Sequence, residues 1–420
     1  MKTDMVKSEV AKPGAMRAPK HGAEGLRGSN QSGLRAHNER LVLSLVRRQG
    51  ALAKSDIARI TGLSAQTVSV IMRALESDGL LIRGEPVRGR IGQPSVPMSL
   101  NPEGAFFFGA KIGRRSVDLV LTDFLGRITA QRRHTYRYPT HDAAVAFLAQ
   151  ALPAMIAEMP AHLRPRIAGL GIAMPFQMWL WAQFVGAPQA EMDDWRDRDI
   201  QAEVAAFSPV PVYVQNDATA ACGAELVFGT APRPKDFLYF YIAYFVGGGI
   251  VLNGQLFTGR TGNAGALGSL PVPGPDGKMR QLISVASMAS LERYLAEAGH
   301  QCDGLWDTPP NWAVPEPILA RWIGEVAQGL AQATLSATAV LDVEAALIDG
   351  WMPPDIRARI VTATRAALRE LDFSGIEPPV IAPGTVGAQA RSLGAASIPL
   401  SQRYLVDPNA FLKERAEAPG

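Results

Sequence analysis

The chain has 420 residues, of which 47% are hydrophobic, and a chain of this length and composition is expected to bury the cores of two or three domains. No apolar run is long and uninterrupted enough to span a bilayer, and the N-terminal stretch lacks the continuous apolar segment of a secretory signal. The cysteines, Cys222 and Cys302, stand too far apart in sequence to form a CxxC pair or a disulfide framework. We therefore expect a cytoplasmic protein.

The charge of the chain is distributed unevenly. The net charge is +3, but residues 1–100 contain 16 Lys and Arg against 8 Asp and Glu, which leaves a net charge of −5 for the remainder. A basic N-terminal part on a mildly acidic body is typical of a nucleic-acid-binding head on a globular domain. A solvated basic leader would produce part of the same asymmetry, because seven of these cations precede His37.

Residues 1–36 are rich in Gly, Ser, Ala, Lys and Arg and contain almost no large apolar side chains. Such a segment cannot bury enough surface to fold alone, so we predict a disordered leader. The ordered part is expected to open with an amphipathic helix over Asn38–Gln49, in which leucines and valines share one face.

The segment Lys54–Gly79 has the pattern of two short helices joined by a tight turn. Gly62 suits the left-handed backbone that ends a helix, Ser55 is a candidate N-cap for the first helix, and Ser64 is one for the second. Apolar residues recur at helical spacing on one side of the second helix, at Val68, Ile71, Met72 and Leu75.

The other side of this second helix carries small, hydrogen-bonding or cationic side chains. Base edges in the major groove of DNA offer donors, acceptors and thymine methyl groups, which such a face can read. We therefore predict the helix-turn-helix of a DNA-binding domain over residues 37–100, although an ordinary pair of surface helices would show a related pattern. The predicted DNA contacts from this helix are Ser64, Ala65, Gln66, Thr67, Ser69 and Arg73.

Two short strands, Leu80–Arg83 and Val96–Leu100, are predicted next, with a basic loop between them. This arrangement is typical of the wing of a winged helix-turn-helix. Arg88 and Arg90 in the loop are predicted to contact phosphates or the minor groove, and a solvated hairpin tip is the alternative. Residues 101–104 are interpreted as a linker.

After the wing, the pattern changes to that of an α/β protein. An order of three meandering strands, helix, strand and helix occurs twice in weakened form. Mixed sheets flanked by helices, in two lobes, are therefore expected over residues 105–400, with residues 401–420 as a C-terminal tail. Because ligands in such sheets bind at the carboxyl ends of strands, the candidate site lies near Pro175, Asn216–Asp217 and Gly247–Gly249.

Several motifs are specific as a set: the helix-turn-helix segment, "SLNPEG", "GIAMP", "VQNDATAACGAE" and "GGGIVLNGQLFTGRTGNAGALG". On these motifs the span from about Asn38 to Pro399 resembles the ROK family (repressor, open reading frame, kinase). The resemblance implies a two-lobed, actin-like and sugar-kinase-type fold of the ribonuclease H-like class. It also implies the N-terminal winged helix-turn-helix that the family's regulators carry.

The resemblance indicates where kinases of the family bind ATP, and the matching turns are altered in this chain. D-x-G-G-T becomes K-I-G-R-R at 111–115, G-T-G-I-G-G-G becomes A-Y-F-V-G-G-G at 243–249, and I-L-G-G becomes I-D-G-W at 348–351. Tight turns that cradle phosphates need glycine, because a side chain would occupy the place of the phosphate. We therefore predict a body that is not an enzyme and needs no cofactor.

The family's zinc site combines an E-x-G-H segment with a cysteine-rich loop. The first segment reads A-L-G-S at 266–269, and the loop "GPDGKMRQLISVASMAS" contains no cysteine. Zinc in proteins is held by Cys, His and carboxylate ligands at characteristic spacing, and no such set stands elsewhere in the chain. We predict no metal site.

The sugar pocket of the family is kept in part. The resemblance assigns the binding of sugar hydroxyls to Asn216 and Asp217, and Glu292 in "SLERY" matches a further sugar-binding carboxylate. A helix N-cap is the alternative role for Asn216, and a vestigial pocket is the alternative for the set. The aromatic residues within 176–181 could stack on a ligand, plug the cleft or pack in the core.

These features together predict a DNA-binding transcriptional regulator, a repressor of carbohydrate-related genes, with a non-catalytic body. Its expected partners are double-stranded operator DNA, a sugar or polyol effector and further copies of itself in a homodimer or homotetramer, and no membrane. Two alternatives stay open. One is an ATP-dependent sugar kinase with Asp217 as its base, and the other is a regulator without any small-molecule effector.

Overall fold

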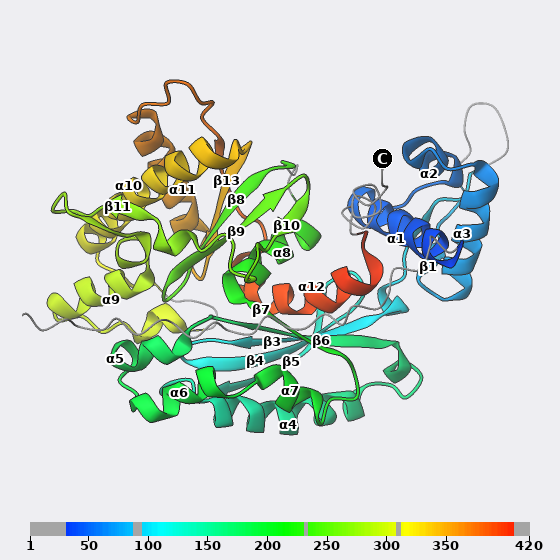
Figure 1. Cartoon of the computed structure of the whole chain (residues 1–420), viewed down its shortest axis with the longest axis horizontal. Coiled ribbons are helices and arrows are strands. Elements are labelled where there is room, and N and C mark those ends of the chain that lie inside the picture. Colours follow the sequence, from blue (N-terminus) through cyan, green and yellow to red (C-terminus); the bar gives the residue numbers. More distant parts are fainter. Residues whose placement is uncertain (1–30, 87–94, 231–233, 308–311, 407–420) are drawn as a thin grey trace, which may run out of the picture.

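The computed structural model describes residues 31–86, 95–230, 234–307 and 312–406 of the chain. Figure 1 shows a mainly helical head at one end and a larger body in which two sheets form the centres of two lobes. The predicted fold class, a winged helix-turn-helix followed by a two-lobed α/β body, is confirmed.

The head contains helices followed by a small antiparallel sheet in which Leu81 pairs with Leu100. Its first helix begins at Gln31, so the last part of the segment predicted to be a disordered leader is helical, and residues 1–30 lie outside the described residues. The elements of the head are α1 (Gln31–Gln49), α2 (Lys54–Thr61), α3 (Ala65–Ser77), β1 (Leu81–Arg83) and β2 (Met98–Leu100).

The turn between α2 and α3 is closed largely as predicted. Gly62 has the left-handed backbone that ends α2, with φ = 72°, and the Ser64 hydroxyl accepts a hydrogen bond from the Thr67 amide at 3.1 Å. The prediction for Ser55 is wrong: α2 begins at Lys54, Ala53 occupies the N-cap position, and no side chain caps the helix.

Lobe 1 is built on a sheet with the strand order β5-β4-β3-β6-β7, in which β6 and β7 run parallel to β3. Figure 1 shows α4, α6 and α7 on one side of this sheet and α12 on the other. The elements are β3 (Phe106–Ile112), β4 (Ser116–Thr122), β5 (Ile128–Thr135), α4 (His141–Glu158), β6 (Ile167–Met174), α5 (Ala182–Val185), α6 (Gln189–Asp197), α7 (Ile200–Ala205) and β7 (Val212–Asn216).

Lobe 2 repeats this plan with the strand order β10-β9-β8-β13-β14, which agrees with the repeated order of elements in the sequence. Its elements are β8 (Phe237–Ile242), β9 (Val246–Leu252), β10 (Gln255–Phe257), β11 (Pro271–Pro273), β12 (Met279–Gln281), α9 (Met288–Glu297), α10 (Glu316–Leu341), β13 (Ala345–Gly350), α11 (Pro354–Arg369) and β14 (Val380–Pro383). None of the described helices is long and apolar enough to cross a bilayer.

Two helices, α8 (Asp217–Phe228) and α12 (Ala390–Tyr404), pack against each other between the two sheets (Figure 1). Glycine allows this close approach. A Cβ on Gly394 would lie 2.1 Å from the carbonyl oxygen of Ala220, and a Cβ on Gly171 would lie 1.9 Å from that of Ala395. The small residues along α12 therefore let it lie directly against both α8 and β6.

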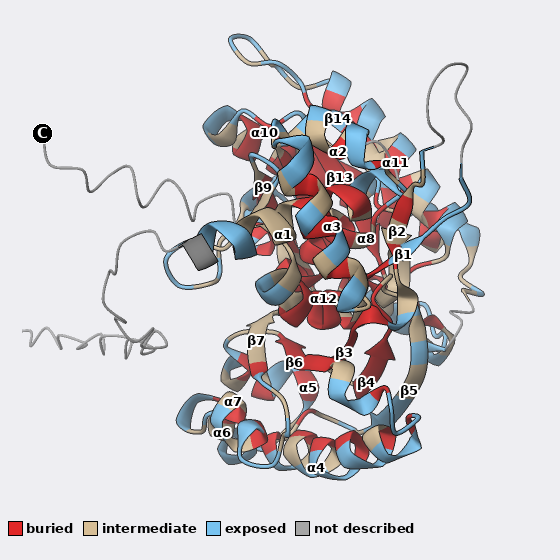
Figure 2. Cartoon of the chain, turned by 90° about the vertical axis from the view of Figure 1, so that its right-hand side faces the viewer, coloured by how far each residue is buried: buried red, intermediate tan, exposed pale blue. Residues whose placement is uncertain are grey.

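The head and lobe 1 share one hydrophobic core. The same cluster of buried side chains contains Ile57 and Met72 from the head, Phe107 and Phe124 from lobe 1, and Leu400 from α12. Figure 2 shows buried residues running from the centre of the head through α12 to the sheet of lobe 1. Burial of apolar surface is the main favourable term in folding, so the two parts stabilise each other.

Polar contacts reinforce this junction. The Arg47 guanidinium donates to the Phe124 carbonyl oxygen at 2.6 Å. Arg166 of lobe 1 donates to the carbonyl oxygens of Asp78 and Gly104, each at 3.1 Å. The segment 101–104, interpreted as a linker, contains a 3-10 turn in which Gly104 is buried. The head and lobe 1 therefore form one structural unit.

The last helix, α12, continues to Tyr404, four residues past the boundary predicted at residue 400. The Tyr404 ring packs against Phe107 and Phe124 with centroid distances of 5.9 and 5.1 Å. Beyond it, the Val406 amide donates to the Ser44 hydroxyl of α1 at 3.1 Å. The end of the described chain thus belongs to the junction between head and body, and residues 407–420 lie outside the described residues.

We predict that Phe124→Ala destabilises the head and lobe 1 together. Removing this fully buried ring from the shared core is expected to cost about 3–5 kcal/mol of unfolding free energy. Hydrogen exchange should then become faster in both α3 and β3, measured by mass spectrometry. Phe257→Ala, at a ring that is 46% exposed, is the control and should leave both unchanged. Unchanged exchange in α3 of the Phe124 variant would contradict the shared core.

Candidate functional site

The exposed side of α3 is the candidate DNA-reading face. Ser64, Ala65, Gln66 and Arg73 are exposed and Thr67 and Ser69 are half-buried, whereas the apolar residues predicted for the opposite side are buried. Figure 1 shows α3 at the outer end of the head, away from lobe 2. The structure therefore brings the six predicted residues of this helix onto one accessible surface.

The side chains on this face differ in their freedom to contact bases. Besides capping the helix, the Ser64 hydroxyl lies 2.8 Å from that of Thr67, so both hydroxyls already have partners. The Arg73 Nε donates to the Ser69 carbonyl oxygen at 3.2 Å, which orients the guanidinium along the helix. Gln66 and the remaining Arg73 donors are the polar groups best placed to read base edges.

One residue of the reading face was missed by the sequence analysis. Val70 is 46% exposed and stands four residues after Gln66 and three before Arg73, which places it on the same side of α3. Its apolar side chain suits a thymine methyl group. The helical spacing from Gln66 could have identified it, but the sequence analysis assigned Val70 to neither side of the helix.

The wing is attached to the reading helix by an ion pair. The Arg83 guanidinium of β1 donates to both carboxylate oxygens of Glu76 of α3, at 2.6 and 3.0 Å. Arg88 and Arg90, the predicted phosphate or minor-groove contacts, lie outside the described residues. This ion pair therefore fixes the position of β1, the strand that precedes the basic loop in the sequence, relative to α3.

The predicted effector residues lie at the boundary between the two lobes. Asn216 ends β7 and caps α8, because its Oδ1 accepts from the amides of Ala218 and Thr219, each at 3.1 Å. The alternative role predicted for Asn216 is thus present. Asp217, the next residue, pairs with Arg391 of α12 at 3.2 Å. Asn216 and Asp217 lie at the carboxyl end of β7, which is where ligands bind in sheets with parallel strands.

Glu292 lies apart from this pair, on α9 of lobe 2. Its carboxylate accepts from the Trp306 indole at 2.6 Å and from Arg115, at the end of the β3–β4 turn in lobe 1, at 3.4 Å. Among the described residues, no hydrogen bond or ion pair joins Glu292 to Asn216 or Asp217. Glu292 therefore takes part in a contact between the lobes.

A buried charge cluster lies at the end of β3, in the position of the altered first phosphate turn. The Lys111 ammonium is 2.6 Å from Asp118, and Arg133 pairs with the other oxygen of the same carboxylate. Burial lowers the pKa of Lys111 to about 8, against the opposing effect of Asp118. Burial raises the pKa of Asp118, but Lys111 and Arg133 outweigh it and the pKa falls to about 2.

Side chains from both lobes meet across the boundary. Arg114 lies over the Tyr244 ring with its guanidinium carbon 4.2 Å from the ring centroid, and Arg115 lies 5.5 Å from the Trp306 centroid. Trp181 and Phe184 of lobe 1 pack on Phe245 of lobe 2 at 5.2 and 5.9 Å. The sequence analysis left three roles open for the aromatic residues within 176–181. The contact between Trp181 and Phe245 fills part of the boundary between the lobes.

The third altered turn, at the end of β13, holds a fully buried carboxylate. Asp349 accepts from the Tyr239 hydroxyl at 2.9 Å and from the amides of Gly350 and Gly387 at 2.9 and 2.8 Å, and it pairs with Arg357. Backbone amides of this kind are donors that a phosphate would need. In this structure the protein's own carboxylate accepts from them.

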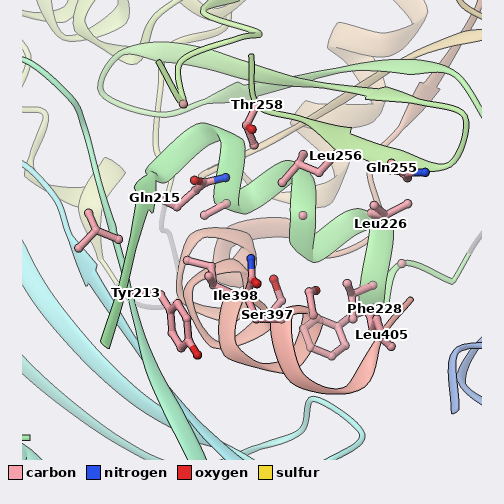
Figure 3. Close-up of a pocket in the computed structure, with 18 of the residues that line it drawn as sticks. Tyr213, Gln215, Leu226, Phe228, Gln255, Leu256, Thr258, Ser397, Ile398 and Leu405 are labelled. Atoms are coloured by element: carbon pink, nitrogen blue, oxygen red, sulfur yellow. The ribbon is translucent and has the colours of Figure 1, made fainter. Parts of the chain in front are cut away.

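A large groove lies elsewhere, between the head, α8, α12 and the edge strands β7 and β10 (Figure 3). Its volume is about 3280 Å³, and none of Asn216, Asp217 and Glu292 lines it. The lining includes Tyr213, Gln215, Leu226, Phe228, Gln255, Ser397 and Leu405. The sequence analysis did not anticipate this groove, because segments far apart in the chain form it.

Among the described residues, no three His, Cys, Asp or Glu side chains are arranged to hold a metal ion. Cys222 is buried in α8 next to Gly249 of β9, and Cys302 is half-buried. Burial raises the pKa of the Cys222 thiol, which disfavours the thiolate that a metal would need.

Comparison with known proteins identifies two sequence families in this chain. The ROK family matches residues 107–398, and a winged helix-turn-helix DNA-binding family matches residues 35–82. The first match covers most of the two-lobed body, and the second covers α1 to β1 of the head.

Among similar proteins, an uncharacterised protein of Sinorhizobium fredii, y4fQ, is 25% identical over 374 residues, which is 87% of this chain and 91% of that protein. The xylose repressor of Bacillus subtilis is 23% identical over 244 residues, 58% of this chain and 62% of the repressor. A solved ROK family transcriptional regulator, a homologue of the Escherichia coli MLC protein, aligns with a TM-score of 0.64 at 20% identity and covers 88% of this chain and 97% of its own.

A ROK family glucokinase from Streptomyces griseus, solved with glucose and AMPPNP, aligns with a TM-score of 0.54 at 20% identity. This alignment covers 70% of the present chain and 99% of the glucokinase. At such identities the structural alignments establish the fold of the body and of the attached head, and not the chemistry of the site.

We predict that Asp118→Asn destabilises the protein by about 3–5 kcal/mol near neutral pH, because it leaves Lys111 and Arg133 without their shared carboxylate. The folded-state pKa of Asp118 is about 2 and lies below its usual 3.8, so its stabilising effect is complete above pH 4. As the pH falls through 4 towards 2, wild type loses this contribution and the difference between the two proteins should shrink. Urea denaturation from pH 2 to 7 measures it.

The matched control is Asp303→Asn, since the Asp303 side chain is 84% exposed. It should change stability little at any pH in this range. A pH-independent difference between wild type and the Asp118 variant would contradict the role given to the buried carboxylate.

Proposed function

The chain belongs to the ROK family, and we propose that it is a DNA-binding transcriptional repressor of carbohydrate-related genes whose body senses a ligand and does not phosphorylate it. The observation that carries this proposal is the accessible polar face of α3, held on a winged helix-turn-helix head. The repressor names of relatives such as the xylose repressor support the same function. A cytoplasmic location, where the operator is accessible, is part of the proposal.

The proposed mode of DNA binding follows the geometry of the head. Gln66, Val70 and Arg73 contact base edges in the major groove, while the basic wing loop with Arg88 and Arg90 contacts phosphates or the minor groove. A homodimer would place two copies of α3 on half-sites about one helical turn, roughly 34 Å, apart. A homotetramer remains compatible with the same pairing.

The absence of catalysis is proposed from the altered turns. Lys111 occupies the position of the kinases' metal-arranging acid, Arg114 contacts Tyr244, and Asp349 accepts from the amides at the third turn. A buried carboxylate would repel a phosphate, and a lysine cannot bind Mg²⁺. Asp217, the base in the family's kinases, is held by Arg391.

The proposed effector site includes Asn216, Asp217 and Glu292 at the lobe boundary. Because the head shares its core with lobe 1, a ligand that changes the angle between the lobes moves the head relative to lobe 2. Such a ligand alters DNA binding only if its affinity differs between the two arrangements. A regulator without an effector is the remaining alternative, and the absence of any ligand-induced stabilisation would favour it.

We predict that Gln66→Ala and Arg73→Ala weaken binding to the operator by about 1–3 kcal/mol and relax base preference at the positions that they read. Arg88→Gln or Arg90→Gln should weaken binding to all sequences more evenly and reduce its salt dependence. Footprinting and gel shifts on the promoter region next to the gene measure both effects.

Arg59→Gln is the control, because Arg59 is exposed on α2 and pairs with Asp56 of the same helix. It should leave base preference unchanged. If wild-type protein forms no specific complex at physiological salt, the proposed function is wrong.

We also predict no phosphoryl transfer from Mg-ATP to any member of a sugar panel, because all three phosphate turns are altered. A coupled assay for ADP measures this reaction. Sugar-dependent turnover that Asp217→Asn abolishes would establish the kinase alternative. Turnover that persists in this variant would point to a contaminating enzyme.

A further inference from the structure

Two consecutive arginines at the lobe boundary have incomplete hydrogen bonding. Arg114 and Arg115 follow Gly113 at the end of β3 and reach towards lobe 2. The Nε atoms of both are buried and find no acceptor among the described residues. Buried donors of this kind are rare in folded proteins, and each requires an explanation such as an absent ligand.

The partners that these guanidiniums do have are weak. Arg114 lies on the Tyr244 ring and pairs with no carboxylate in the described part of the chain. Arg115 is 3.4 Å from Glu292 and 3.6 Å from Asp303, which is 84% exposed. Strong guanidinium–carboxylate pairs are bidentate, with N–O distances of roughly 2.7–2.9 Å. A carboxylate or phosphate that lay between the two arginines would therefore replace loose contacts with better ones.

The charge balance at the boundary also favours an anion. The cations in or next to it are Lys111, Arg114, Arg115, Arg133 and Arg391, and the carboxylates are Asp118, Asp217, Glu292 and the exposed Asp303. An excess of buried positive charge is costly unless an anion offsets it. The pKa of Lys111 is lowered to about 8, mainly by burial, and the positive charge of Arg391 adds to this effect.

A neutral polyol fits the same residues less well. The hydroxyl acceptors predicted for it are Asp217 and Glu292, but Asp217 is paired with Arg391, and Glu292 accepts from Trp306 and Arg115. A ligand that offers only hydroxyl groups would have to compete with charged donors for these oxygens. An anionic ligand instead brings its own acceptor to the arginines.

We propose that the effector carries a carboxylate or phosphate group, as a sugar acid or sugar phosphate does, and that Arg114 and Arg115 bind this group. The inference rests on the proposed function, because it concerns the effector of that repressor. The anion replaces Glu292 as the partner of Arg115, so its binding breaks a contact between lobe 1 and lobe 2. Anion binding is thereby coupled to the angle between the lobes and, through the shared core, to the position of the head.

The experiment uses the full chain and matched triads of ligands at constant ionic strength. Each triad contains a neutral polyol, the corresponding aldonate and the corresponding polyol phosphate, in several configurations, with inorganic phosphate as the probe for the group alone. Binding is measured by calorimetry and by the shift in melting temperature. We expect at least one anionic member to bind about tenfold or more tightly than its neutral counterpart. The aldonate and phosphate arms show which anionic group is preferred.

Three variants test the assigned residues. Arg114→Gln and Arg115→Gln should each weaken binding of the preferred anion by about tenfold, whereas Arg280→Gln, at an exposed arginine paired with Asp276, should not. Glu292→Gln should strengthen anion binding because it removes the competing carboxylate. If Glu292 instead binds a ligand hydroxyl, the same substitution should weaken binding, which separates the two models.

Circular dichroism and urea denaturation of each variant test its folding, because operator binding itself depends on the contact between Arg115 and Glu292. Anion affinity of Arg115→Lys, which keeps the charge but not the bidentate geometry, should lie between that of wild type and that of Arg115→Gln. Equal affinity for neutral and anionic members, no binding of any anionic member, or unchanged anion binding in both arginine variants would overturn the proposal. Each of these outcomes leaves operator binding intact. Loss of operator binding in wild type would instead contradict the proposed function.

Discussion

The hydrophobic core that continues from the head into lobe 1 is the contact on which the rest of the structure depends. Ile57 and Met72 of the head, Phe107 of lobe 1 and Leu400 of α12 belong to one buried cluster, so neither part can rotate freely against the other. A change in the angle between the lobes, as in the proposed function, would therefore move the head together with lobe 1 relative to lobe 2.

The lobe boundary illustrates how one fold supports different chemistry. In the family's kinases the turns at this boundary are glycine-rich, because backbone amides must approach phosphate closely. In this chain Arg114, Arg115 and Tyr244 fill two of these turns and contact each other or Glu292, while Asp349 accepts from the amides near the third. Side chains that replace the small residues of these turns thus join the lobes, and the arginines among them bring the positive charge to which the proposed anionic ligand would bind.

Much of the fold could be predicted from the sequence, and the site only in part. The reading helix, the left-handed turn at Gly62 and the cap at Ser64 were predicted correctly because they depend on residues a few positions apart. Val70 was missed because an exposed apolar residue carries the same signal as a core residue. The DNA and effector roles of the predicted residues stay predictions, since the structure contains neither DNA nor ligand.

The sequence by itself determined the domain order, the family and the loss of the phosphate turns, because helical periodicity, capping and glycine patterns act over short distances along the chain. Only the tertiary structure decided that residues 101–104 are packed and that α12 runs past Leu400 into the junction. It alone revealed the pairs Arg115–Glu292 and Arg391–Asp217 and the groove beside α8. These contacts join residues far apart in the chain, and which distant charges meet depends on how the two lobes pack against each other.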